Sequence, residues 1–148
     1  MLKSTTAKNI FSIVFGLAAG FSIVFVQLII QYIIYPTPAG MDITDADATR
    51  EFAALAPPII LILVIIFYSL ATFAGGFVAA TVAVNKRMTK AITVGGILIG
   101  FGAYNPFMMP HPVWTVFISL LVFIPCSYFG GYLGIKMTAK RKLKAEKA

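Results

Sequence analysis

Acidic residues and a single histidine are the groups in this chain that could do chemistry in water. Asp42, Asp45 and Asp47 follow one another closely, and His111 lies between two prolines much later. Such carboxylates could bind Ca²⁺, but Arg50 stands where an EF-hand loop starting at Asp45 requires glycine. Helix capping and exclusion of positive charge from an outer loop explain the acids without a metal. We therefore expect no metal and no other cofactor.

His111 is the group whose charge changes near neutral pH, so it is the candidate general base. It could approach Asp42 or Asp45, with Asn105 nearby, in a candidate outer-face polar cluster made of these four residues. A surface histidine with an ordinary hydrogen bond is the alternative. The chain has no Ser-His-Asp, Cys-His or paired-carboxylate pattern and no phosphate-binding loop. We predict that it is not an enzyme, and an enzyme using His111 ranks as the third hypothesis.

The elements that must position these groups are long apolar stretches. Of the 148 residues, 59% are hydrophobic and 11% are charged, whereas a soluble domain has about 25% charged residues. Stretches without any charge cover about 10–35, 58–84, 91–109 and 113–135, each near the length of about 20 residues that crosses a bilayer. The third stretch crosses fully only if it continues past Pro106. The composition predicts one all-α membrane domain, 1–148, with four transmembrane helices.

The positions of the basic residues predict the orientation. Eleven of the twelve lie in the N-terminus, in the 85–90 turn or in the tail at 136–148, while the 36–57 loop holds four of the five acids. Because Lys and Arg mark the cytoplasmic side, both termini are expected in the cytoplasm. The first stretch is too long for a signal peptide. The 36–57 loop is expected to carry a short surface helix from Asp45 to about Ala56.

Residues at the two membrane surfaces are expected to anchor the protein in the lipid bilayer. Tyr35 and Trp114 fit the outer aromatic belt, and Lys136, Lys140 and Arg141 fit the cytoplasmic surface. Basic residues beside a span are attracted to anionic lipid. The tail lacks the interleaved aromatic residues that would stack on bases, so nucleic acid is not the expected partner.

Small residues at four-residue spacing in every span predict close helix packing. The glycines concerned are Gly16, Gly20, Gly75, Gly76, Gly96, Gly100, Gly130, Gly131 and Gly134. Packing within one bundle is the first interpretation, and the seam of a homo-oligomer is the alternative. The match of residues 71–79 with 126–134, at an offset of 55, predicts two tandem hairpins related by an axis along the membrane normal. Chance similarity of glycine-rich helices is the alternative.

Gln27 and Gln31 lie on one face of the first span, where they could bond a neighbouring helix or line a polar pocket. Together with Pro125 and the possible repeat, they motivate a second hypothesis, a carrier or channel for a small or hydrophobic solute. No acid or base lies within a span, so coupled ion transport lacks its usual carrier. The first hypothesis is a structural or interaction subunit that associates with itself or with another membrane protein.

Two stretches of the chain carry a family resemblance. These are the YPxPxGxDxxD stretch at Tyr35–Asp45 and the MPHPxW stretch at Met109–Trp114. With a Gly-Gly helix before each cytoplasmic end, the chain resembles a family of small bacterial four-helix membrane proteins with no assigned activity, over about residues 10–135. The resemblance implies location in the bacterial cytoplasmic membrane, and it transfers no catalytic residues.

Overall fold

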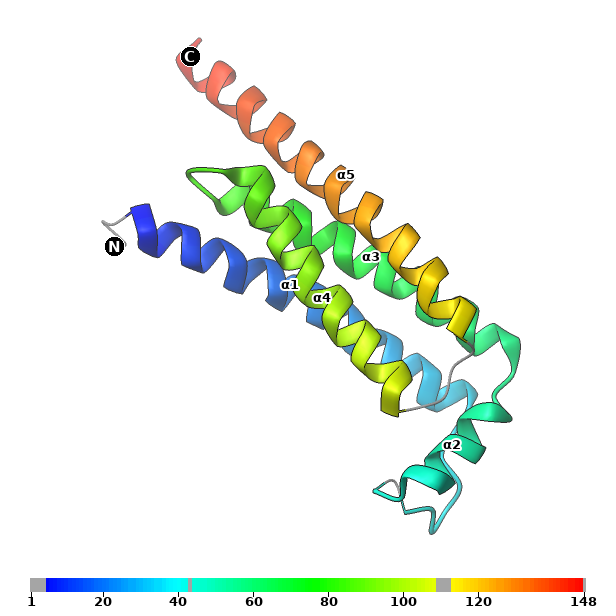
Figure 1. Cartoon of the computed structure of the whole chain (residues 1–148). Coiled ribbons are helices and arrows are strands. Elements are labelled where there is room, and N and C mark those ends of the chain that lie inside the picture. The colour runs from blue at the N-terminus through cyan, green and yellow to red at the C-terminus, as the bar shows by residue number, and fades with distance from the viewer. Residues whose placement is uncertain (1–4, 43, 109–112, 148) are drawn as a thin grey trace.

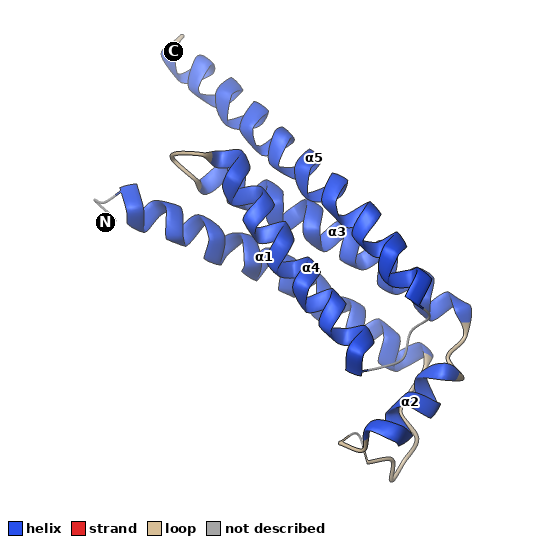
Figure 2. Cartoon of the chain, viewed as in Figure 1, coloured by secondary structure: helices blue, strands red, loops and turns tan. Residues whose placement is uncertain are grey.

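Five helices account for most of the chain in the computed structural model. They are α1 (Thr5–Ile34), α2 (Ala46–Ala54), α3 (Pro58–Val82), α4 (Arg87–Met108) and α5 (Val113–Glu146). The structure describes residues 5–42, 44–108 and 113–147, and the side chains of these except 46, 103–108, 113–116, 119 and 120. No strand occurs among the described residues (Figure 2). The predicted all-α class is thereby confirmed.

Local sequence explains where several helices begin. Pro58 occupies the first turn of α3, where the missing N–H of proline costs no hydrogen bond. Asp45 caps α2 through its side chain. α4 starts at Arg87, before its apolar stretch, and runs through Pro106 to Met108 within it. α5 extends beyond its apolar stretch, into the basic tail as far as Glu146. The tail propagates from an existing helix and contains Lys, Arg and Ala, which favour helix.

α3 is the central helix of the bundle. α1 and α5 pack on either side of it, and α4 lies against all three; α4 crosses in front of α3 in the view of Figure 1. In the described part of the chain α1 and α5 do not contact each other, although α3 contacts α4. The arrangement therefore departs from the two-fold symmetry that the predicted repeat of hairpins implies.

The chain ends and loops are sorted between the two ends of the bundle. Figure 1 shows the N-terminus, the turn between α3 and α4, and the end of α5 at one end, with α2 at the other. The end of α5 projects past the turn. Basic residues thus gather at the first end and the acidic loop lies at the second.

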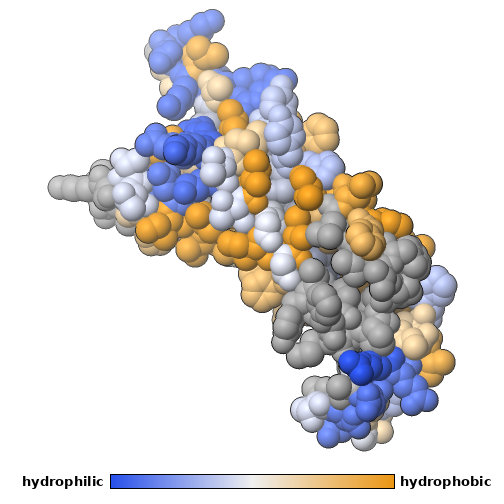
Figure 3. All heavy atoms as spheres, viewed as in Figure 1, coloured by the Kyte–Doolittle hydropathy of each residue, from blue (hydrophilic) through white to orange (hydrophobic). Residues whose placement is uncertain are grey.

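The outside of the bundle is apolar between these ends. By length and composition α1 and α3 qualify as membrane-crossing helices, and only 22% and 33% of their most apolar windows are buried. A core helix of a soluble protein would bury most of such a stretch. Ile33 of α1 is 72% exposed and Leu121 of α5 is 76% exposed. Figure 3 shows orange side chains between blue ends, interrupted by grey atoms.

The buried core consists of small clusters. In the half nearer α2, Tyr68 of α3 stacks on Phe123 of α5 with ring centroids 5.8 Å apart, next to Val24 of α1. In the half nearer the α3–α4 turn, Val94 and Leu98 of α4 cover the crossing of α1 and α3. Few large side chains lie inside, so backbones that approach closely must supply much of the packing.

Candidate functional site

Asp42 begins the structured part of the outer loop. Its Oδ1 accepts hydrogen bonds from the amide of Thr44 at 2.9 Å and from the Thr44 hydroxyl at 2.6 Å. These bonds favour the ionised carboxylate and hold the pKa of Asp42 below its usual value, with the Thr44 hydroxyl as the largest cause. The preceding Gly40 has a φ of +84°, a left-handed conformation that suits glycine. Asp42 therefore closes a turn.

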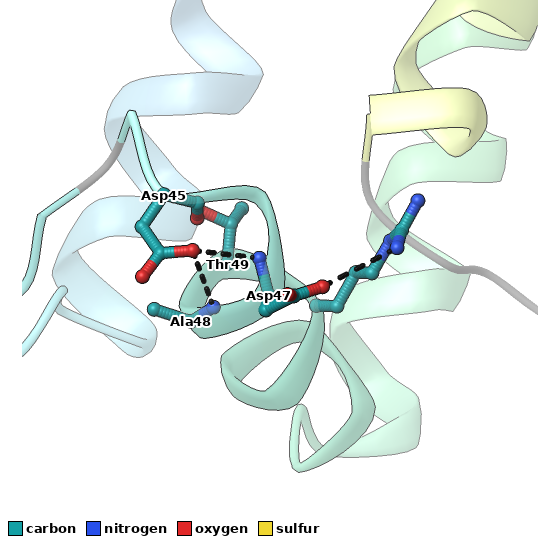
Figure 4. A network of polar contacts seen from close by, with 5 residues as sticks. Asp45, Asp47, Ala48 and Thr49 are labelled. Atoms are coloured by element: carbon teal, nitrogen blue, oxygen red, sulfur yellow. Dashed lines mark hydrogen bonds and ion pairs between the residues drawn. The ribbon is translucent and has the colours of Figure 1, made fainter.

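The next two acids belong to the start of α2 (Figure 4). The Asp45 Oδ1 accepts the amides of Asp47 at 2.9 Å and Ala48 at 3.4 Å, as an N-cap does. Asp47 forms an exposed ion pair with Arg50 at 3.4 Å. Each acid thus has a partner within the loop. Among the described residues, no group of three His, Cys, Asp or Glu side chains is arranged to hold a metal.

The remaining members of the predicted outer cluster have less of their structure described. Asn105 lies in the last turn of α4, and its side chain is not among those described. His111 lies outside the described residues, between α4 and α5. The pairing of His111 with Asp42 or Asp45 therefore stays a prediction.

Tyr35 ties the outer loop to the end of α1. Its ring stacks on Phe52 of α2 with a centroid distance of 4.4 Å, and its hydroxyl donates to the Phe52 carbonyl oxygen at 3.1 Å. The residue predicted to anchor the chain in lipid thus also holds α2 in place. Trp114, the other predicted aromatic anchor, lies in the first turn of α5, and its side chain is outside the described set.

Glycines bring the backbones of α1 and α3 into contact. A Cβ added at Gly16 would lie 2.8 Å from the Gly75 carbonyl oxygen, and one added at Gly75 would lie 2.9 Å from the Gly16 carbonyl oxygen. Gly20, one turn further along α1, provides the space that the Leu98 side chain of α4 occupies. A side chain larger than hydrogen at Gly16 or Gly75 would push α1 and α3 apart, whereas at Gly20 the end of the Leu98 side chain would have to shift.

α3 and α5 cross through a second, reciprocal set of contacts. A Cβ added at Gly76 would lie 2.7 Å from the Ser127 carbonyl oxygen, and one added at Gly130 would lie 2.9 Å from the Phe73 carbonyl carbon. One turn later, Gly134 faces Ala80. Ser127 lies three residues before Gly130, and Phe73 lies three residues before Gly76. Gly76 and Gly130 therefore occupy equivalent positions in this contact. The sequence match pairs Gly76 with Gly131 instead, a difference of one residue in register.

The prediction for the glycines of α4 needs a correction. An added Cβ at Gly96 or Gly100 would have no atom within 4 Å, apart from its own helix. The prediction that these two residues pack α4 within the bundle is therefore wrong. Gly95 faces Ser127 and Gly102 faces Tyr68 instead. The helix thus turns the Gly95 side inward, and Gly96 and Gly100 lie on its exposed face.

The helix-to-helix contact of α4 with α5 also involves a polar bond. Ser127 is buried and donates from its hydroxyl to the Ala91 carbonyl oxygen at 3.0 Å. Gly131, one turn further along α5, faces the Ala91 side chain, with an added Cβ 2.6 Å from it. The predicted small residues therefore accommodate one cross-helix hydrogen bond at this crossing.

Gln27 and Gln31 bond each other within α1. The Gln27 Nε2 donates to the Gln31 Oε1 at 2.6 Å, and Gln27 is buried. One turn of the helix brings the two amides together, and the interpretation that they also bond a neighbouring helix stays a prediction. Thr72 and Ser12, also buried, donate to carbonyl oxygens of their own helices. These buried polar groups are satisfied separately, and the described ones form no continuous polar lining.

Asn9 is a structural residue that the sequence reasoning missed. Its Oδ1 accepts the amides of Val84 and Asn85, both at 3.3 Å, and so ties α1 to the turn after α3. The same turn places Lys86 at a φ of +48°. The sequence shows only a carboxamide close to the predicted cytoplasmic end of the first span. The partner of that carboxamide is known only from the structure, which places the turn after α3 beside it.

The basic residues predicted as inner-surface anchors are exposed on α5. Lys136, Lys140 and Arg141 lie beyond Gly134, the last glycine of α5 in contact with α3. The Lys136 Nζ stands 6.0 Å from the centre of the Tyr132 ring.

Comparison of the chain with protein families, with curated proteins and with solved structures finds no match. The geometry of the chain itself is therefore the basis for a functional proposal.

Proposed function

We propose that this chain is an integral protein of the bacterial inner membrane that crosses it four times with both termini in the cytoplasm. It would serve there as a structural or interaction subunit rather than as a catalyst. The observation that carries this proposal is the separation of charge between the two ends of an apolar bundle. Lys8, the 85–90 turn and the helical tail lie at one end, and the acidic 36–57 loop lies at the other.

The lengths of the less apolar helices support four crossings. At 1.5 Å per residue, the uncharged part of α4, 91–108, extends about 27 Å, and the uncharged part of α5, 113–135, extends about 34 Å. Both lengths match a hydrocarbon core of about 30 Å. With α1 and α3 of similar or greater length, all four long helices could cross the same slab.

The interior of the bundle supports a role in assembly. Close contacts at Gly16, Gly76 and Gly130 join its backbones, and no described buried side-chain nitrogen or oxygen lacks a hydrogen-bond partner. Such an interior is suited to a fixed scaffold. The mostly exposed apolar surface of α1 and α3 would then be available to lipid and to other membrane proteins.

Topology reporters test the membrane part of the proposal. A reporter fused after Ala148 should read cytoplasmic, and one inserted after the exposed Gly40 should read periplasmic. Wild-type reporter insertions should be compared with a variant in which Lys86, Arg87 and Lys90 are changed to Gln, because removing these charges weakens the orientation signal. A periplasmic reading after Ala148 in the wild type would overturn the orientation.

Cross-linking in native membranes tests the assembly part. A subunit should yield a cross-linked species larger than one copy of the chain, either as a self-oligomer or with a second protein. The matched control is the same treatment after the membranes are dissolved in excess detergent, which should return the single chain. If the chain cross-links only as a monomer in intact membranes, the role as an interaction subunit is contradicted.

A further inference from the structure

Contacts between helices fix the positions of the basic residues along the bundle axis, at the end of the bundle where the α3–α4 turn lies. Gly134 of α5 lies beside Ala80 of α3, and Gly131 lies beside Ala91 of α4. Because a helix rises 1.5 Å per residue, Lys136 lies about 3 Å beyond Gly134 and Lys140 about 9 Å beyond it. α3 ends only two residues after Ala80, so these lysines are level with the turn that follows.

That turn brings basic residues of the other helices to the same level. Asn9 accepts the Val84 and Asn85 amides, so its neighbour Lys8 lies beside the turn that contains Lys86 and Arg87. Lys90 follows one turn into α4. We name this set the basic collar, and its members are Lys8, Lys86, Arg87, Lys90, Lys136 and Lys140.

The collar lies where the uncharged surface of the bundle ends. Ile135 is the last residue of the uncharged part of α5, and Lys136 stands over the half-exposed ring of Tyr132. By helical periodicity Lys136 and Lys140 lie on the side of α5 away from Gly134, the side that faces outward. The polar headgroup layer is about 5–7 Å thick on each side of the hydrocarbon core. The collar is therefore at the depth of phospholipid headgroups.

The described part of the chain supplies no negative partner for the collar. Among the described residues, no acid forms an ion pair with a collar residue, and the ion pair that the structure shows, Asp47–Arg50, is at the opposite end. Neither α1 nor α4, whose N-termini lie at this end, has an acidic residue in its first turn. The positive dipole ends of α1 and α4 lie here, but the negative end of α3 offsets part of them. The positive potential therefore comes chiefly from the collar side chains.

We infer that the basic collar binds the headgroups of anionic phospholipids and that the lysines further along α5 do not share this role. The inference rests on the proposed membrane insertion and names the partner of its inner surface. The distal lysines are Lys142, Lys144 and Lys147. They lie about 9, 12 and 16 Å beyond Lys136, whereas Lys140 lies about 6 Å beyond it. The distal lysines are therefore past a headgroup layer about 5–7 Å thick that begins near Lys136, and they are more than a Debye length of about 8 Å from Lys136.

Spin-labelled lipids in nanodiscs test this inference directly. The purified full chain is placed in nanodiscs of phosphatidylcholine, and its relative affinity for spin-labelled phosphatidylglycerol over phosphatidylcholine is measured by electron spin resonance. A headgroup beside one collar residue should be favoured about fivefold, equal to about 1 kcal/mol. Averaged over the whole lipid-facing surface, we expect a preference of about twofold, which salt on the order of 1 M should abolish.

Two variants with equal loss of charge locate the binding residues. The collar variant carries Lys86→Gln, Arg87→Gln and Lys136→Gln, and the distal variant carries Gln at each of the three distal lysines. We expect the collar variant to lose most of the preference and the distal variant to keep it. If the collar variant does not fold, the single changes Lys86→Gln and Lys136→Gln should each lower the preference in part, and an unchanged preference in both would overturn the inference.

Other outcomes contradict the inference and point elsewhere. No preference for phosphatidylglycerol in the wild type would overturn it, whatever the reporters say of topology, because both leaflets of a nanodisc have the same lipids. Equal or larger loss in the distal variant would also overturn it. That result would indicate that the distal lysines of the α5 tail themselves contact the anionic headgroups.

Discussion

Replacing Gly16 by alanine should destabilise the bundle at the crossing of α1 and α3. The new methyl group would lie 2.8 Å from the Gly75 carbonyl oxygen, 2.9 Å from the Ala79 Cβ and 3.0 Å from the Val94 Cγ2, where ordinary contact begins at 3.4 Å. The Gly75 and Ala79 atoms cannot rotate away because they belong to the backbone or are attached to it. Both helices must therefore move apart at this point.

The size of the effect follows from two opposing contributions. Overpacking costs about 1–3 kcal/mol, whereas alanine is favoured over glycine inside a helix by about 1 kcal/mol. Because three neighbours in two helices are affected, the cost should exceed the gain. We expect Gly16→Ala to lower the free energy of unfolding by about 1–2 kcal/mol.

Gly96→Ala provides the matched control. The change of residue type is the same, the position is also inside a helix, and no atom lies within 4 Å of the added Cβ apart from its own helix. Only the gain in helix propensity remains, so this variant should be as stable as the wild type or more stable by up to about 1 kcal/mol. The gain is common to both variants, so they should differ by the overpacking cost of about 1–3 kcal/mol.

The assay is reversible unfolding of the purified proteins in mixed micelles, with helicity as the signal and particle size recorded alongside. Equal stability of Gly16→Ala and Gly96→Ala would refute the packing argument. So would a loss of stability in Gly96→Ala together with a smaller particle, because Gly96 would then pack against a second copy.

Three further changes test individual contacts. Ser127→Ala removes the buried bond to the Ala91 carbonyl and should lower the free energy of unfolding by about 0.5–1 kcal/mol in the same assay. The control is Ser22→Ala, which should have no measurable effect because the Ser22 hydroxyl bonds its own helix in an exposed position. Equal effects of the two changes would contradict the cross-helix role of Ser127. Asn9→Ala should speed amide hydrogen exchange at Val84 and Asn85, since both amides lose their acceptor, with exchange in the middle of α3 as the reference. Thr44→Val removes the hydroxyl that chiefly lowers the pKa of Asp42, so that pKa should rise towards its usual value in an NMR titration, and an unchanged pKa would exclude the bond. In the wild type the ionised carboxylate should hold this turn above the ordinary aspartate pKa of about 3.9 and release it only as the pH falls through the lowered pKa.

Local sequence predicts most of the helices of this fold. Runs of uncharged apolar residues predicted four long helices, and the 36–57 loop was predicted to carry a short helix from Asp45 to about Ala56, where the structure has α2. These features depend on backbone hydrogen bonding and on neighbours a few residues away. The same local pattern overlooked the helical tail, because its lack of apolar residues says nothing about a helix that continues from the preceding span.

Only the tertiary structure determines which side of each helix faces the inside of the bundle. Gly95 and Gly96 are neighbours about 100° apart around α4, and either could face the bundle on the evidence of spacing alone. Val94 and Leu98 fill the space over Gly16 and Gly75, which turns Gly95 inward and leaves Gly96 outside. The choice depends on how shapes from several helices fit together, and a local motif carries no information about that fit. The sequence by itself determined the helices and the separation of charge, whereas packing determined which small residues make contact and which basic residues share one level.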